Sequence, residues 1–240
     1  THADHWVYAC ALLLVLGILT WILYWMIPEE EEGIPAQKKE TAGESNWGFF
    51  KEPIFYLVIL TLFFYLCAEQ GVIGWMITYF KDTGLLSPSV STITASVQWI
   101  MILLGRLSAA FLSLKIGKEK LLPVMGVGLV AFFILLIFSK TTFWIMVGIV
   151  GFGYSMAGIY PTTVSFSGKL QQKYPMAWSF ILTTASFGSI LMPSVIGKIA
   201  AGAGIAVGMS SVAVVLVIDF VCIIALCIYT VRSQPQERIS

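Results

Sequence analysis

The sequence predicts an all-α membrane protein with seven transmembrane helices, six of which form one C-terminal bundle. Seven long apolar stretches each hold about the twenty residues that a helix needs to cross a hydrocarbon core of about 30 Å. None of them alternates polar and apolar residues as a strand of a membrane barrel would. Apolar residues make up 58% of the chain and charged residues only 11%, whereas a soluble domain has about a quarter charged.

The apolar stretches divide the chain into one helix, a linker and a bundle. Residues 28–53 form a long, polar and charge-blocked segment, which is typical of a solvated linker. The other connections are short. We therefore expect a last helix of a preceding unit at 1–27, the linker at 28–53, a six-helix bundle at 54–231 and a tail at 232–240. The seven predicted spans are 6–27, 54–80, 90–114, 121–138, 143–165, 178–200 and 207–228.

The basic residues predict how the chain is oriented in the cell membrane. Only Lys81, Lys140 and Lys198 lie in the alternate connections, and basic loops resist translocation. The basic side is therefore expected to be cytoplasmic, with the N-terminal end outside and the linker and C-terminus inside. Its residues are Lys38, Lys39, Lys51, Lys115, Lys118, Lys120, Lys169, Lys173, Arg232 and Arg238.

The N-terminal end indicates a longer protein. An outside N-terminus needs a signal, but the sequence has neither an initiator methionine nor a signal peptide. We therefore expect this chain to be the C-terminal part of a longer transporter-like protein, whose N-terminal half is its missing partner.

Several function classes have little support. The net charge of +1 provides no field for nucleic acid. No histidine lies in a span, and the clustered nucleophiles, bases or ligands that an enzyme or a metal site needs are not apparent. The four cysteines fall within spans and are interpreted as small buried apolar residues. We expect no enzyme activity, no metal and no cofactor.

Two spans carry stripes of small and hydroxyl residues on one helical face. Such a stripe has two interpretations: a seam where helices pack closely, or a polar wall facing a water-filled cavity in which prolines free backbone groups. We favour the cavity for the stripes taken together. The fifth span holds Gly151, Ser155, Gly158, Thr162 and Ser165 beside Pro161, and the sixth holds Ser179, Thr183, Ser186 and Pro193.

Three ionisable residues lie inside spans: Glu69 beside Gln70, Arg106, and Asp219. Each costs about 3 kcal/mol or more if it faces lipid, so each is expected to face the bundle or a cavity. Arg106 can reach polar groups or extend toward the inner face. Glu69 has two alternative interpretations: it takes part in proton transfer or substrate binding, or it is a buried, neutral acid held by hydrogen bonds. Asp219 has no polar neighbour in the sequence to suggest a role.

A short internal similarity points to an inverted repeat. The third span ends in GRLSAA at 105–110 and the sixth in GKIAAG at 197–202, each in the second helix of a three-helix group. The two helices run in opposite directions through the membrane, as inverted-topology repeats require.

Four short motifs of the bundle carry a resemblance to a known family: FYLCAE at 64–69 with GWMITY at 74–79, the Gly-Arg step at Arg106, GIYPT at 158–162, and SFILT at 179–183 running to Pro193. In this order they resemble the seventh, eighth, tenth and eleventh helices of the fucose–proton symporter branch of sugar permeases. The bundle as a whole resembles the C-terminal half of a major facilitator superfamily transporter.

The resemblance implies a secondary active transporter that moves a small solute by alternating access, most simply a sugar by proton symport. A carrier of another small organic solute, or a non-transporting sensor of the same fold, remains the alternative. The second, third, fifth and sixth spans would line the cavity, and the branch's coupling acids would lie in the missing half. The implied substrate-binding residues are Glu69, Gln70, Trp75, Ser155, Thr162, Ser179 and Thr183, with Arg106, Pro161 and Pro193 gating or structural.

Overall fold

The computed structural model describes residues 5–26 and 47–237, and it forms two compact units, 1–44 and 45–240. The first unit contributes α1 (His5–Met26), an apolar helix whose described side chains are exposed. Its stretch Cys10–Met26 is apolar but shorter than the membrane-spanning helices of the second unit.

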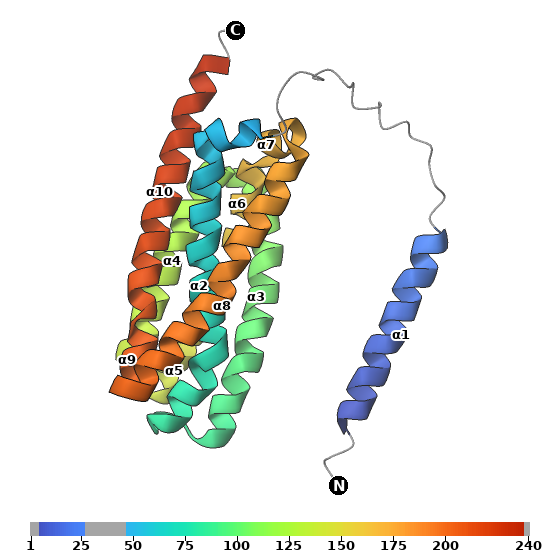
Figure 1. Ribbon diagram of the computed structural model, residues 1–240. Helices are drawn as coiled ribbons and strands as arrows, with labels where there is room; N and C mark the ends of the chain where they lie inside the picture. Colours follow the sequence, from blue (N-terminus) through green and yellow to red (C-terminus); the bar gives the residue numbers. More distant parts are fainter. Residues whose placement is uncertain (1–4, 27–46, 238–240) are drawn as a thin grey trace. The chain divides into compact units, whose positions relative to one another are not determined.

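The second unit is a bundle of helices that run along a common axis (Figure 1). Six of its helical segments are long and apolar enough to cross a membrane, and every regular element among the described residues is helical, which confirms the all-α prediction. The elements are η2 (Gly48–Lys51), α2 (Pro53–Asp82), α3 (Pro88–Ile116), α4 (Lys118–Phe138), α5 (Thr142–Met156), α6 (Ile159–Phe166), α7 (Gly168–Lys173), α8 (Pro175–Ala203), α9 (Ile205–Ser210) and α10 (Val212–Glu237).

Proline and glycine mark the ends of the long helices. Pro53, Pro88 and Pro175 occupy the first turns of α2, α3 and α8, where the missing N–H has no helical partner to lose. Gly117 and Gly204 adopt φ values of 82° and 88° in the turns before α4 and α9. That left-handed conformation is readily reached only by glycine, so these positions allow the chain to reverse within one or two residues.

Two of the predicted spans are interrupted. The fifth span divides into α5 and α6 at Ala157–Gly158. Pro161 lies four residues after Ala157. In a continuous helix its ring would clash with the Ala157 carbonyl, and it has no N–H to donate to that carbonyl. The seventh span divides at Ser211 into the short α9 and the long α10. The sequence predicts one continuous helix for each of these two spans.

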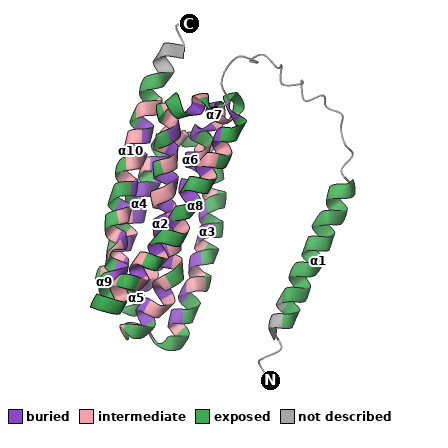
Figure 2. Ribbon diagram, viewed as in Figure 1, coloured by how far each residue is buried: buried purple, intermediate pink, exposed green. Residues whose placement is uncertain are grey.

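The core surrounds α2, which packs against α8, α10 and α3, while α4 packs against α5 and α10. Buried residues line the inward surfaces of these helices, as the purple segments in Figure 2 show. At the start of α2, the fully buried ring of Phe49 lies 4.9 Å from Phe55 and 5.4 Å from Phe180. The end of the segment expected to be linker is thus packed onto the bundle.

The helix contacts fit the inverted repeat. In an inverted repeat, α2 would be equivalent to the α5–α6 span, α3 to α8, and α4 to the α9–α10 span. The contact of α3 with α5 is then equivalent to that of α8 with α2, and the contact of α4 with α5 is equivalent to that of α10 with α2. Each of these pairs packs together, and so do α4 and α10, which are equivalent to each other. The glycines of the two repeated motifs are also equivalent: a Cβ on Gly105 would lie 2.6 Å from the Tyr154 oxygen, and one on Gly197 3.0 Å from Trp75.

Candidate functional site

Glu69 lies at the centre of a polar cluster where α2 meets the break between α5 and α6. Only 8% of its surface is exposed. The hydroxyl of Tyr65, one turn earlier on α2, lies beside the Glu69 carboxyl and donates a 3.1 Å hydrogen bond to the carbonyl of Met156, the last residue of α5. The ring of Tyr160 on α6 lies 6.3 Å from that of Tyr65. The acid is therefore held between α2 and the interrupted fifth span.

Arg106 brings a positive charge to this cluster from α3. The Arg106 side chain is exposed on the surface of the bundle. It is close enough to Glu69 and to the Tyr160 phenol for its positive charge to interact electrostatically with both. An exposed arginine near a buried carboxyl on a neighbouring helix can bind the polar groups of a ligand without first breaking a direct ion pair. Arg106 was predicted as a gating or structural residue; its position places it in the same neighbourhood as Glu69.

Trp75 and Pro193 are joined directly. The indole Nε1 of Trp75 donates a 2.9 Å hydrogen bond to the carbonyl of Pro193 on α8. Gly197, one turn further along α8, lies against the same indole ring. This contact fixes the position of the Trp75 ring between α2 and α8. Its N–H is already used by the protein, so the ring face and edge are what remain for a ligand.

The exposed faces of the bundle are of two kinds. On α3 and α8 they carry polar side chains within the apolar spans: Thr92, Ser96 and Arg106 on α3, and Ser179, Thr183, Ser186 and Ser194 on α8. On α4 (residues 121–138) and α10 (residues 212–231) every exposed side chain is Val, Ile, Phe or Ala. Gln70, the neighbour of Glu69, is half-buried on α2. The apolar faces suit lipid, whereas the polar faces suit water or another protein surface.

The stripe on the fifth span divides between two roles. Gly151, Ser155 and Gly158 lie against Phe132, Gly128 and Met125 of α4, and Ser155 is buried there. This part of the stripe is a packing seam of small residues, as the first interpretation held. Thr162 and Pro161, in contrast, line a cavity of about 140 Å³. The other lining residues are Ala109, Ala110 and Ser113 of α3, Lys118 of α4 and Ser165 of α6. The structure therefore does not bring Ser155 to the cluster around Glu69.

Asp219 is buried on α10, with 1% of its surface exposed, and neither carboxyl oxygen has a hydrogen-bond partner among the described residues. It lies on α10, which packs against α2. It lies apart from the polar faces of α3 and α8. Among the described residues there is no group of three or more His, Cys, Asp or Glu positioned to hold a metal ion.

Tyr65 and Tyr160 were missed as candidate site residues. Tyr65 precedes Glu69 by four residues, so the two side chains share one face of the helix, and this spacing could have identified it. Tyr160 immediately precedes Pro161, but its proximity to Tyr65 depends on the packing of α6 against α2, for which the sequence provides no signal.

A family model decides the class of protein. The model described as Major Facilitator Superfamily matches residues 4–173, more than two thirds of the chain. The chain belongs to the major facilitator superfamily. This result confirms the resemblance found in the sequence, and it agrees with the expectation that the chain belongs to a family of transporters and not of enzymes.

Individual relatives within the superfamily are distant. The chain is 25% identical over 228 residues to the "Protein TsgA homolog" of Yersinia pseudotuberculosis and, at the same identity, to that of Yersinia pestis. These alignments cover 94% of this chain and 56% of each relative. The chain thus spans about half the length of the curated relatives that it matches.

Solved superfamily structures share the fold. FucP in the outward conformation matches with a TM-score of 0.62 and 19% identity, over 71% of this chain and 42% of FucP. A variant of the E. coli fucose:proton symporter FucP matches with a TM-score of 0.64 and 18% identity, over 73% and 43%. A peptide transporter, POT, matches with a TM-score of 0.64 and 15% identity, over 71% and 37%. At these identities the similarity concerns the fold.

Proposed function

We propose that the chain is the C-terminal half of a secondary active transporter that moves a small solute by alternating access. The difference between the exposed faces supports this proposal most directly. Within their spans α3 and α8 expose hydroxyl groups and Arg106 among apolar side chains, whereas α4 and α10 expose apolar side chains. One half of a carrier needs such a difference, because one side borders a central cavity and the other borders lipid. The coverage of about half of each relative agrees with such a division.

We further propose that the solute is a sugar, moved together with a proton. The polar groups are hydroxyls on the exposed face of α8 and, on α2, the buried Glu69 carboxyl, the half-buried Gln70 amide and the half-buried Trp75 indole. Together they suit a ligand rich in hydroxyl groups. The fold is shared with FucP, which is a fucose:proton symporter. In this proposal Glu69 and Gln70 bind the hydroxyl groups of the solute, and Trp75 provides an apolar surface. Arg106 supplies the positive charge near Glu69.

Uptake by the full-length carrier tests the proposed function. Proteoliposomes with an imposed pH gradient, acidic outside, are expected to concentrate one of a panel of labelled monosaccharides and to lose the accumulation when the gradient is dissipated. Labelled dipeptides serve as the comparison, because the POT fold is shared as well. Concentrative uptake of a dipeptide but of no sugar would replace the sugar proposal, and binding without uptake would favour a sensor.

Leucine substitutions test the wall of the cavity. Ser179→Leu adds an apolar branch to an exposed position on α8, where there is room for it. Losing a polar contact and filling space should weaken solute binding by about tenfold while expression stays near normal. Ser210→Leu is the matched control, since Ser210 is also exposed but lies on α9. Equal affinities in both variants would remove the exposed face of α8 from the site.

Thr162→Leu tests the cavity between α3 and α6 independently. Thr162 is buried with 7% of its surface exposed, and it lines a space of about 140 Å³. A leucine would occupy part of that space, so a comparable loss of solute affinity is expected. Normal affinity in Thr162→Leu would show that solute does not reach this cavity.

Cysteine labelling tests the proposed orientation. Lys120 and Lys173 are exposed at the start of α4 and the end of α7, and Asp82 and Lys140 are exposed at the end of α2 and just after α4. Single cysteines at the first pair should react with an impermeant maleimide only after the membrane is opened, and those at the second pair in intact cells, because the basic connections are expected to be cytoplasmic. The background carries alanine at all four native cysteines. Labelling of position 120 in intact cells would reverse the orientation.

A further inference from the structure

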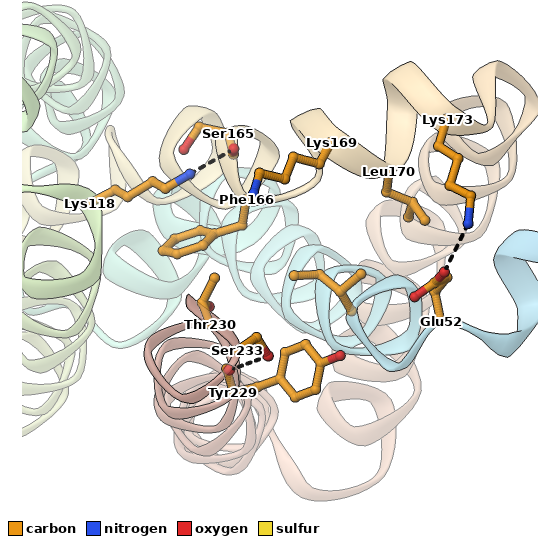
Figure 3. A pocket seen from close by; sticks show the side chains of 11 residues that line it. Glu52, Lys118, Ser165, Phe166, Lys169, Leu170, Lys173, Tyr229, Thr230 and Ser233 are labelled. Carbon is orange, nitrogen blue, oxygen red and sulfur yellow. Dashed lines mark hydrogen bonds and ion pairs between the residues drawn. The ribbon is translucent and has the colours of Figure 1, made fainter. Parts of the chain in front are cut away.

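A second pocket lies at the end of the bundle that carries η2 and α7, away from the polar face of α8. Its volume is about 340 Å³, and it is formed by the starts of α2 and α4, the α6–α7 segment and the end of α10. Figure 3 shows its side chains converging from these elements. Ile54, Phe166 and Leu170 provide its apolar part.

Positive charge dominates the lining of this pocket. Three lysines, Lys118, Lys169 and Lys173, line it together with one carboxylate, that of Glu52. The phenol of Tyr229 and the hydroxyls of Thr230 and Ser233 add further polar groups from α10 (Figure 3). A pocket with an excess of two positive charges and several hydroxyls suits an anion.

Two of the lysines are held in place by the fold. Lys118 donates a 3.0 Å hydrogen bond to the carbonyl of Ser165, and its ammonium lies 4.6 Å from the centre of the Phe166 ring. Lys173 lies 3.8 Å from the Glu52 carboxylate. Because these ammonium groups are already ordered, a bound anion loses less free energy to ordering side chains than it would at freely rotating lysines.

The surroundings favour a lipid over a small soluble anion. The pocket lies at the basic end of the bundle, which we propose faces the cytoplasm, and the cytoplasmic leaflet is rich in anionic lipids. The same helices α4 and α10 also form a groove of about 440 Å³ whose apolar lining suits an acyl chain. It is lined by Pro123, Ile224, Cys227, Ile228 and Val231, together with the charged Arg232.

We propose that this pocket binds the phosphate of an anionic phospholipid headgroup. The ammonium groups of Lys118 and Lys169 contact the phosphate oxygens. The Lys173 ammonium interacts with both the phosphate and the Glu52 carboxylate. Basic pockets between transmembrane helices at the cytoplasmic surface bind headgroups of this kind. The proposal does not require the solute to be a sugar, and the pocket shares Lys118 and Ser165 with the cavity that Thr162 lines.

Native mass spectrometry of the full 240-residue chain in detergent tests this site. Dioctanoyl phosphatidylglycerol is the probe, and dioctanoyl phosphatidylcholine is the comparison of equal chain length. The protein is expected to retain phosphatidylglycerol preferentially. Lys169→Gln and Lys118→Gln should each lower its apparent affinity by about fivefold, which is the effect of one lysine near an anionic headgroup.

Lys120→Gln is the matched control, because Lys120 is exposed at the same end of the bundle but outside the pocket, and the substitution changes the net charge equally. Each variant is first shown to elute as the parent does in size-exclusion chromatography; if Lys118→Gln fails this check, Lys169→Gln decides alone. An equal loss in Lys120→Gln, or equal retention of phosphatidylcholine, would overturn the site. Displacement of the lipid by equimolar glycerol 3-phosphate or inorganic phosphate would overturn the lipid as ligand and assign the pocket to a soluble phosphate.

Discussion

The Glu69→Gln variant of the full-length carrier is expected to keep pH-driven uptake with a modestly altered solute affinity. Glutamine preserves the shape of the side chain and most of its hydrogen bonds, but it cannot ionise. Tyr65 lies beside this side chain and donates its own hydrogen bond to the Met156 carbonyl, so the geometry of the cluster should survive the change. If Glu69 binds the solute and leaves the coupled proton to other groups, accumulation persists.

Glu69→Ala should have a far larger effect. It removes the carboxyl beside Tyr65 and, with it, the hydrogen bonds proposed to the solute. The loss of a hydrogen bond to a buried or charged group costs about 1–3 kcal/mol, or roughly 5- to 150-fold in solute affinity. Uptake and solute exchange are both measured. Loss of accumulation in Glu69→Gln with exchange intact would assign the coupled proton to Glu69 itself. Unchanged transport in Glu69→Ala would remove this residue from the site.

Gly188→Val is expected to destabilise the bundle severely. Gly188 is buried on α8, and a Cβ there would collide with the carbonyl oxygen of Phe63 and lie 3.0 Å from the sulfur of Cys67. Both of these groups belong to α2, and a backbone atom cannot rotate away, so α2 and α8 would have to separate. Overpacking of this kind costs roughly 3 kcal/mol. The thermal midpoint of the detergent-solubilised protein, followed by size-exclusion chromatography, should fall by several degrees.

Gly202→Val provides the control on the same helix. Nothing lies within 4 Å of a Cβ at Gly202, and the residue is exposed. Its substitution changes helix propensity in a similar way without forcing helices apart. A similar thermal midpoint for the two variants would show that the contact between α2 and α8 does not limit stability.

The helices could be predicted from the sequence because membrane insertion leaves a strong local signal. About twenty consecutive apolar residues mark each span, and the proline at the start of α2, α3 or α8 marks its first turn. The breaks at Ala157–Gly158 and Ser211 could not be predicted in the same way. Pro161 signals some disturbance, but a proline can kink a helix or end it, and the choice depends on the helices packed around it.

The site could be predicted only in part. Glu69 and Arg106 stood out because charge is rare in a span, and the exposed hydroxyls of α8 followed from helical spacing. Small-residue stripes do not reveal which neighbour they face. The part of the stripe around Ser155 packs on α4, whereas Thr162, two turns later and beyond the break, borders a cavity. Rotation of a helix about its axis depends on tertiary packing, which the spacing alone does not contain.

The short helix α6 contributes residues to three sites. Its Tyr160 lies near Glu69, its Thr162 borders the cavity against α3, and its Phe166 lies in the basic pocket under the Lys118 ammonium. Eight residues thus connect the proposed solute site with the proposed lipid site. A displacement of α6 would make the two allosterically linked, and linkage is reciprocal: lipid would change solute affinity by the same factor by which solute changes lipid retention. The lipid composition of the membrane would then act as an effector of the carrier.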